Sequence, residues 1–246
     1  MHLKTADEIE KMRKGGKILS EILREVGTMA RPGVTTEELD TYAERRILGA
    51  GGLPAFKGYT TRYATEPFPS TLCTSLNAEV VHAPAVPKRV LKEGDLLSID
   101  IGMRYPAVGG LYTDMATTVS VGKASKEAKR LIEVTHESLR IGIRAVRAGA
   151  SIARIGRIVQ DYVEREGFSV VRDLVGHGVG HAVHEDPYVP NYYDSRLEEV
   201  IIPENLPLAI EPMVAAGGAA VRTEDDGWTV ITTDGRYSAH LEATVV

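Results

Sequence analysis

The stretch Gly176-His177-Gly178-Val179-Gly180-His181-Ala182-Val183-His184-Glu185 gathers three histidines and three glycines into ten residues. Glycines allow tight turns and a close approach of the backbone to a ligand. Imidazoles seven positions apart can reach one site, where one binds a metal ion and the other hydrogen-bonds a substrate. Taken alone, the stretch is equally compatible with a glycine loop whose histidines face solvent.

Carboxylates in apolar, strand-like runs flank this stretch on both sides. They are Asp100, Asp114, Glu211 and Glu242. Buried carboxylates are unfavourable unless a cation or hydrogen bonds compensate them, and the one basic residue near these runs is Arg104. Together with His177 the acids offer five ligands, enough for two divalent metal ions. Two such ions can hold a bridging hydroxide and polarise a carbonyl group, which suits amide hydrolysis.

Composition excludes several classes of protein. The 246 residues are 43% hydrophobic and 26% charged, as in ordinary globular enzymes, and the net charge of −5 does not favour nucleic acid or an anionic membrane as partner. The single cysteine, Cys73, has no internal disulfide partner, which fits a reducing compartment. We find neither an apolar run of ~18 residues nor the apolar segment of a signal peptide. The expected location is therefore the cytoplasm.

Helical periodicity and capping signals alternate with short strand-like runs. Thr5 with Glu8 and Thr35 with Glu38 have the spacing of capping boxes. Helices are predicted over residues 6 to about 28, 35–49, 125–147 and 151–166, strands over 79–82, 95–102 and 111–121, and an irregular aromatic loop over 53–70. This order of elements predicts an α+β fold.

The second half of the chain repeats the first in outline. Residues 1–122 and 123–246 each give two helices and then strands, and Arg31-Pro32-Gly33-Val34-Thr35 is echoed by Arg147-Ala148-Gly149-Ala150-Ser151. We see no long flexible linker between the halves. The pattern predicts a single domain, residues 1–246, built from two similar halves around a shared sheet with a site at their junction.

Six stretches in combination resemble one known family. They are Cys73-Thr74-Ser75-Leu76-Asn77-Ala78-Glu79-Val80-Val81-His82, Ser98-Ile99-Asp100-Ile101-Gly102, residues 176–187, Ala209-Ile210-Glu211-Pro212-Met213-Val214, Asp226-Gly227-Trp228-Thr229-Val230 and Ser238-Ala239-His240-Leu241-Glu242-Ala243-Thr244. The chain resembles the creatinase-like pita-bread hydrolases and, within them, the short bacterial form of type I methionine aminopeptidase. The resemblance implies a curved antiparallel sheet covered by helices, in two pseudo-symmetric halves.

The resemblance also implies an activity: removal of the initiator methionine from nascent proteins whose second residue is small, by a metal-bridging hydroxide. Two divalent ions (cobalt, manganese, iron or zinc) would be bound by Asp100, Asp114, His177, Glu211 and Glu242. The partners would be nascent polypeptides, with transient association with the ribosome, and the enzyme would be a monomer that binds neither nucleic acid nor membrane.

The remaining family roles fall on residues outside the ligand set. His184 would bind the scissile carbonyl group, His82 the amide nitrogen beyond it, and Glu211 would shuttle protons as well as bind metal. The methionine pocket would be lined by Tyr59, Phe68, Cys73 and Trp228, which suits a thioether. His181 matches no role, and a surface position is expected for it.

The chain departs from the family pattern at several positions. Residues 60–67 and 104–110 look inserted, Val183 replaces a bulkier aromatic residue, Ala243 a histidine and Ala83 a glycine. These changes affect the shape of the pocket more than metal binding. Two alternatives stay open: a proline-specific aminopeptidase of the same fold, which usually carries a large additional N-terminal domain, and a binding module that has lost its metals.

Overall fold

The helices begin and end close to the predicted residues. The computed structural model describes residues 1–61 and 66–246, and its helices are α1 (Ala6–Met29), α2 (Thr36–Gly49), α3 (Lys126–Ala145), α4 (Ile152–Arg165) and the short 3-10 helix η1 (Ser195–Leu197). Both predicted capping boxes are present, with Thr5 before α1 and Thr35 before α2 each exchanging hydrogen bonds with the glutamate three residues later. The four predicted helices are confirmed because their end signals are local in sequence.

The strands form one large antiparallel sheet and two small ones. The strands are β1 (Leu53–Pro54), β2 (Leu72–Leu76), β3 (Glu79–Val81), β4 (Leu96–Tyr105), β5 (Leu111–Ser120), β6 (Ser169–Val170), β7 (Gly176–Gly178), β8 (Glu185–Val189), β9 (Leu208–Ile210), β10 (Met213–Ala215), β11 (Val221–Thr223), β12 (Val230–Thr232), β13 (Ser238–His240) and β14 (Glu242–Val245). The large sheet has the order β1-β4-β5-β14-β9-β7-β8, with β2 also paired to β4. The small sheets are β13-β10-β6 and β11-β12-β3. The predicted α+β class is confirmed.

The β4–β5 hairpin forms the centre of the first half. The two strands pair over their whole length, from Leu96 opposite Ser120 to Tyr105 opposite Leu111. The segment 104–110, which looked inserted in the sequence, therefore extends β4 and closes the hairpin without disturbing the register further in. Of the other inserted segment, 60–67, residues 62–65 lie outside the described part of the chain, and the loop around it also contains the short strand β1, which the sequence did not predict.

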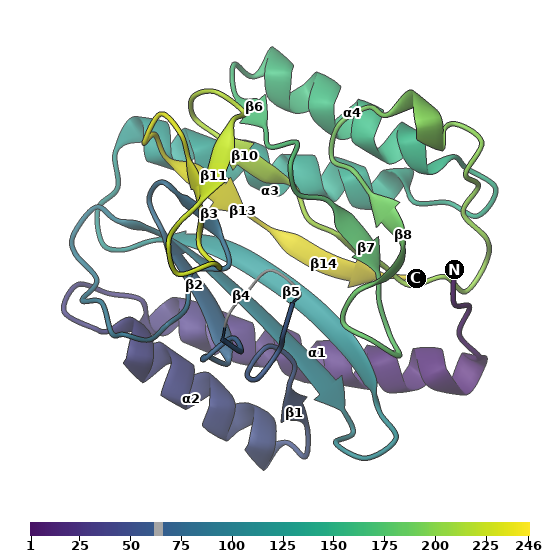
Figure 1. Cartoon of the computed structure of the whole chain (residues 1–246), viewed down its shortest axis with the longest axis horizontal. Coiled ribbons are helices and arrows are strands. Elements are labelled where there is room, and N and C mark those ends of the chain that lie inside the picture. The colour runs from purple at the N-terminus through teal and green to yellow at the C-terminus, as the bar shows by residue number, and fades with distance from the viewer. Residues whose placement is uncertain (62–65) are drawn as a thin grey trace.

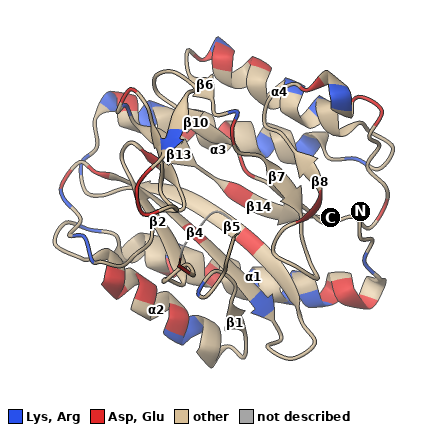
Figure 2. Ribbon diagram, viewed as in Figure 1, with Lys and Arg blue, Asp and Glu red and all other residues tan. Residues whose placement is uncertain are grey.

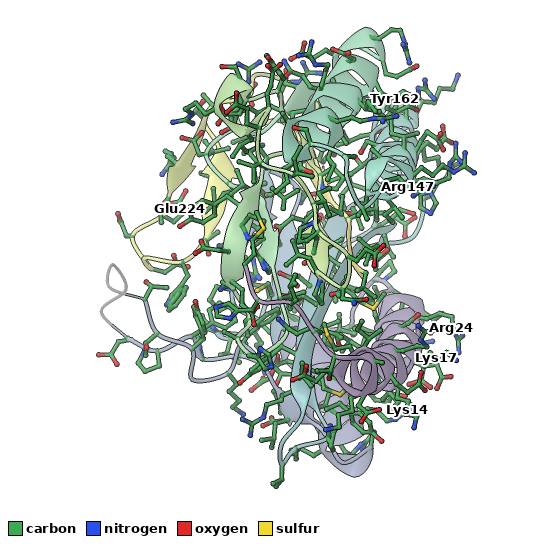
Figure 3. All side chains as sticks on the ribbon, turned by 90° about the vertical axis from the view of Figure 1, so that its right-hand side faces the viewer. Lys14, Lys17, Arg24, Arg147, Tyr162 and Glu224 are labelled. Carbon is green, nitrogen blue, oxygen red and sulfur yellow. The ribbon has the colours of Figure 1, made fainter. Side chains whose placement is uncertain are left out.

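The helices cover one face of the strands and leave the other for the site. In the side view of Figure 3 the labelled residues of α1 and α4, such as Lys17 and Tyr162, lie on one side of the strands and Glu224 on the other. Ile99 and Ile101 of β4 belong to the same buried cluster as Leu19 and Ile22 of α1. Because side chains alternate along a strand, Asp100 must face away from these helices. Figure 1 shows α1 and α2 beside the first-half strands and α3 and α4 beside the second-half strands.

Within the described residues, no helix combines the length and the apolar character that crossing a membrane requires.

Candidate active site

Two of the predicted acids come from the central hairpin. The register places Asp100 of β4 opposite Ala116 of β5, and Gly102 opposite Asp114. Residues two positions apart on a strand share a face, so the two aspartates are diagonal neighbours on the face opposite the helices. Both are buried, with 7% and 4% of their surface exposed.

The second half of the chain brings the remaining acids to the same place. Glu242 opens β14 opposite Ala116, and Glu211 directly follows β9. His177 on β7 pairs with Ala209 of β9. Figure 2 shows one acidic position within β5 and one on β14, each next to uncharged ribbon. The strands thus bring together all five residues that the sequence singled out.

Pairwise distances show how close these groups lie. His177 Nε2 is 3.3 Å from Glu211 Oε1. Ligand atoms of Asp114, His177 and Glu242 lie within 4.8 Å of one another, and so do those of Glu211, His240 and Glu242. Each group combines carboxylate oxygens with one imidazole nitrogen, a donor set that divalent ions accept.

The electrostatics of the site call for a cation. Burial raises the pKa of Asp100 to about 7, and burial together with the neighbouring carboxylates raises the pKa values of Asp114, Glu211 and Glu242 well above their ordinary range. Among the described residues, Asp100 Oδ1 and Glu242 Oε1 are buried without a hydrogen-bond partner. A divalent cation would stabilise the charged carboxylates and pair with these oxygens. The residues present therefore fit such an ion.

The imidazole of His177 is oriented for ligation. Its Nδ1 lies 2.8 Å from the carbonyl oxygen of Gly178, and as this oxygen can only accept, Nδ1 carries the proton. Nε2 is then left with its lone pair directed at the carboxylates. Burial also lowers the pKa of His177, which favours the neutral form that binds metals.

A cavity of about 490 Å³ joins the acids to an aromatic pocket. Its lining includes every predicted ligand, His82, His184 and the predicted pocket residues Tyr59, Phe68, Cys73 and Trp228. The backbone N–H of Phe68 donates to the carbonyl oxygen of Tyr59 at 2.8 Å. The two residues are therefore adjacent in space although the segment 60–67 separates them in the sequence. The rings of Phe68 and Trp228 meet edge to face with centroids 5.2 Å apart.

Cys73 lies at the boundary between the apolar and acidic parts of the cavity. It pairs with Asp100 across β2 and β4. Burial, and then the neighbouring carboxylates, raise the pKa of its thiol well above the ordinary value. The thiol is therefore a poor nucleophile and acts as a small apolar wall.

Comparison with known proteins now identifies the family. Residues 10–246 match the model of metallopeptidase family M24. The chain belongs to metallopeptidase family M24. Membership implies a peptidase that depends on divalent metal, in agreement with the donor set described above.

Several named relatives match this chain over almost its whole length. The methionine aminopeptidase of Clostridium perfringens is 46% identical over 244 residues, covering 99% of this chain and 93% of that protein. Methionine aminopeptidase 1 of Bacillus subtilis is 44% identical, covering 98% and 93%. The crystal structure of a methionine aminopeptidase from Thermotoga maritima has a TM-score of 0.93 at 39% identity, covering 100% of this chain and 95% of that one. The resemblance to the methionine aminopeptidases is confirmed.

A solved structure of lower sequence identity shares the fold. The X-Pro aminopeptidase of Thermotoga maritima has a TM-score of 0.73 at 22% identity, and this chain covers 58% of it. The predicted pita-bread fold is thereby confirmed, since both enzymes have the same arrangement of sheet and helices.

The sequence did not predict several residues at this site, among them Phe56 and His240. Phe56 lines the cavity and belongs to the buried cluster of Phe68, Cys73 and Val183. The signal for Phe56 was its place in the aromatic loop. His240, whose side chain lies next to Glu211, was quoted only as part of a motif; its signal was the His-x-Glu spacing with Glu242 in an apolar strand.

The glycine stretch is packed too tightly for any other residue. A Cβ atom on Gly178 would lie 2.4 Å from the carbonyl oxygen of Asp186, and one on Gly180 would lie 2.2 Å from Lys4 Cε. The glycines therefore allow β8 and the N-terminal segment to close around the loop that carries the histidines.

His181, for which no role was predicted, is half exposed and contacts Glu8 Oε1 through Nε2 at 2.8 Å.

A buried ion pair fixes this loop to the N-terminal segment. Lys4 Nζ donates to Glu185 Oε2 at 2.8 Å, and the two side chains are only 0% and 5% exposed. We expect Lys4→Met to lower the free energy of unfolding by about 3 kcal/mol, because it leaves the Glu185 carboxylate buried without its cation. Urea denaturation followed by circular dichroism measures this change.

The matched control is Lys57→Met, which removes a lysine from an exposed pair with Glu44. Solvent screens that pair, so the loss should be below about 1 kcal/mol. Equal losses in Lys4→Met and Lys57→Met would contradict a stabilising role of the buried pair.

Proposed function

We propose that this M24 peptidase is a methionine aminopeptidase that releases the first residue of a polypeptide when the second residue is small. The observation that carries the proposal is that an apolar aromatic pocket and the cluster of carboxylates and imidazoles belong to the same cavity. A free N-terminal residue fits such a cavity with its side chain in the apolar part and its peptide bond beside the cluster.

The pocket selects a flexible apolar side chain. Phe56, Phe68, Trp228 and the Cys73 thiol line the apolar part of the cavity, and aromatic edges pack well against a thioether. The sulfur-containing side chain of methionine is long, unbranched and adaptable, and it matches these walls. Charged or polar first residues would lose hydration without gaining a hydrogen bond.

His184 is oriented to stabilise the scissile carbonyl oxygen. The Tyr59 hydroxyl lies 2.8 Å from His184 Nδ1. When this hydroxyl donates to Nδ1, the ring proton resides on Nε2, which can donate to the oxygen as it gains negative charge. The rings of His184 and His177 are in contact, with centroids 4.5 Å apart, so His184 acts directly beside the ligand cluster.

His82 and Glu211 handle the leaving amine. His82 lines the same cavity, and burial lowers its pKa to about 4, which keeps it neutral and able to hydrogen-bond the amide nitrogen beyond the scissile bond. Glu211 lies within the ligand cluster beside His177, and its carboxylate can accept a proton from water and pass it to the departing nitrogen. The imidazoles crowd this end of the cavity, which favours a small second residue.

Asp100, Asp114, His177, Glu211 and Glu242 would hold two divalent ions. Such ions supply Lewis acidity at the carbonyl group and lower the pKa of water. Manganese, iron, cobalt and zinc all accept these donors. Because the ligands come from both halves, 1–122 and 123–246, the chain acts as one catalytic domain. We further propose a monomer that meets its substrates at the ribosome.

Two tripeptides distinguish the proposal from its nearest alternative. Protein freed of metal is reloaded with manganese, iron or cobalt and given Met-Ala-Ser or Ala-Pro-Ala, with and without chelator. Release of methionine from the first peptide alone, abolished by chelator, is the expected result. Cleavage of Ala-Pro-Ala alone would instead show a proline-specific enzyme, and cleavage of neither with metal bound would refute both activities.

Val183 offers a test of the pocket itself. Its side chain is buried against Phe56, Phe68 and Cys73. We expect Val183→Phe to narrow the pocket and to lower kcat/KM for N-terminal methionine by about tenfold, since overpacking a filled apolar site costs roughly 1–3 kcal/mol. The measurement compares peptides that begin with methionine, norleucine or leucine. An unchanged profile would show that Val183 does not shape the pocket.

A further inference from the structure

His240 is a buried imidazole to which the proposed mechanism gives no role. Only 2% of its surface is exposed, and its Nε2 has no hydrogen-bond partner among the described residues. This nitrogen points toward the site, since it lies 3.8 Å from Glu211 Oε2. That distance is too long for a hydrogen bond but suits two donors that share an ion. An unsatisfied buried nitrogen of this kind requires an explanation.

The backbone holds His240 in this position. The Thr118 hydroxyl accepts from the His240 N–H at 2.9 Å and donates to the His240 carbonyl oxygen at 2.8 Å. His240 ends β13, and Glu242, two residues later, opens β14. Side chains two positions apart in extended backbone share a face. His240 is therefore directed to the same side of the chain as the ligand Glu242.

Two sets of possible ligand atoms share the carboxylate of Glu242. Asp114, His177 and Glu242 form the first, and Glu211, His240 and Glu242 form the second. Each group contains two carboxylates and one imidazole, and the shared carboxylate has an oxygen without a hydrogen-bond partner in the described chain. Glu211 thus has two imidazole nitrogens close to its carboxylate, His177 Nε2 at 3.3 Å and His240 Nε2 at 3.8 Å.

We propose that His240 is a sixth protein ligand of the metal centre, binding through Nε2 the ion that Glu211 and Glu242 also bind. The proposal rests on the proposed function for the presence of two ions. His240 then adds a nitrogen donor to the carboxylate oxygens of that ion. Imidazole favours zinc, cobalt and iron over manganese, whereas carboxylates alone favour manganese and magnesium. His240 thereby biases the metal position beside Glu211 and Glu242 toward metals that prefer nitrogen ligands.

His240→Gln tests this assignment by metal binding instead of activity. Glutamine keeps a polar side chain of similar length but removes the imidazole. We expect the dissociation constant of the second cobalt ion, measured by calorimetry, to rise about 10²-fold, at the upper end of what ligand-supporting groups contribute. Binding of the second manganese ion should change less. His136→Gln, on the exposed face of α3, is the matched control and should bind both ions as the unmodified chain does.

Proton NMR of the dicobalt protein gives an independent readout. A cobalt-bound imidazole has a strongly shifted, solvent-exchangeable ring N–H, so the unmodified chain should show two such signals and His240→Gln one. A single signal in the unmodified protein with two bound ions would overturn the assignment while leaving the proposed function intact. This spectrum decides the question even where the variant folds poorly. A chain that binds no ion and releases no methionine would overturn the proposed function as well.

Discussion

His177→Ala should lose one metal ion and nearly all methionine release. The imidazole Nε2 lies 3.3 Å from Glu211 Oε1 and within the group of ligand atoms that includes Asp114 and Glu242. Removing it leaves an ion with carboxylates alone, and a metal ion contributes several kcal/mol to the stabilisation of developing charge. We therefore expect kcat/KM to fall by about 10³-fold or more. Elemental analysis after dialysis and hydrolysis of Met-Ala-Ser give the two readouts.

His181→Ala is the control for this experiment. His181 lies in the same glycine stretch, but its side chain is half exposed and directed to Glu8. It should retain both ions and most of the activity. Full turnover with two ions retained in His177→Ala would refute the role of His177 as a ligand.

His184→Ala should keep both ions and still lower kcat by about 10²–10³-fold. This is the loss observed when one donor to a developing oxyanion is removed. KM should change less, because the donor acts mainly on charge that develops after binding. Steady-state kinetics with Met-Ala-Ser, combined with metal analysis of the same preparation, provide the measurement. An unchanged kcat would remove His184 from the catalytic residues.

Tyr59→Phe shows whether the tyrosine acts through His184. Loss of the hydroxyl that lies 2.8 Å from His184 Nδ1 leaves the position of the ring proton unfixed, and we expect kcat to fall about tenfold. In the His184→Ala background the same change should have no further effect, because the two residues act as one unit. Equal effects in both backgrounds would place the role of Tyr59 in the apolar pocket instead. Tyr42→Phe is the control, because the Tyr42 hydroxyl contacts Glu25 and neither residue lines the cavity.

Elements with local end signals could be predicted from the sequence. The capping boxes at Thr5 and Thr35 and the serines before α3 and α4 mark helix starts within four residues of the side chains that cause them. The apolar run around Asp100 likewise indicated a buried strand that carries a carboxylate. The short strand β1 was not predicted, because its two residues are held by pairing with β4 and not by their own preferences.

The list of acids and histidines was determined by the sequence, because residue type and an apolar neighbourhood suffice to mark a buried carboxylate that needs a cation. Their arrangement was decided by the tertiary structure. Contacts such as Tyr59 with His184, Lys4 with Glu185 and His240 with Glu211 join residues far apart along the chain, and only the packing of loops and strands in the folded chain brings them together. A shift of the register by one residue would turn each ligand to the opposite face. No local pattern records that register, which is why the orientation of His184 and the role of His240 emerged only from the folded chain.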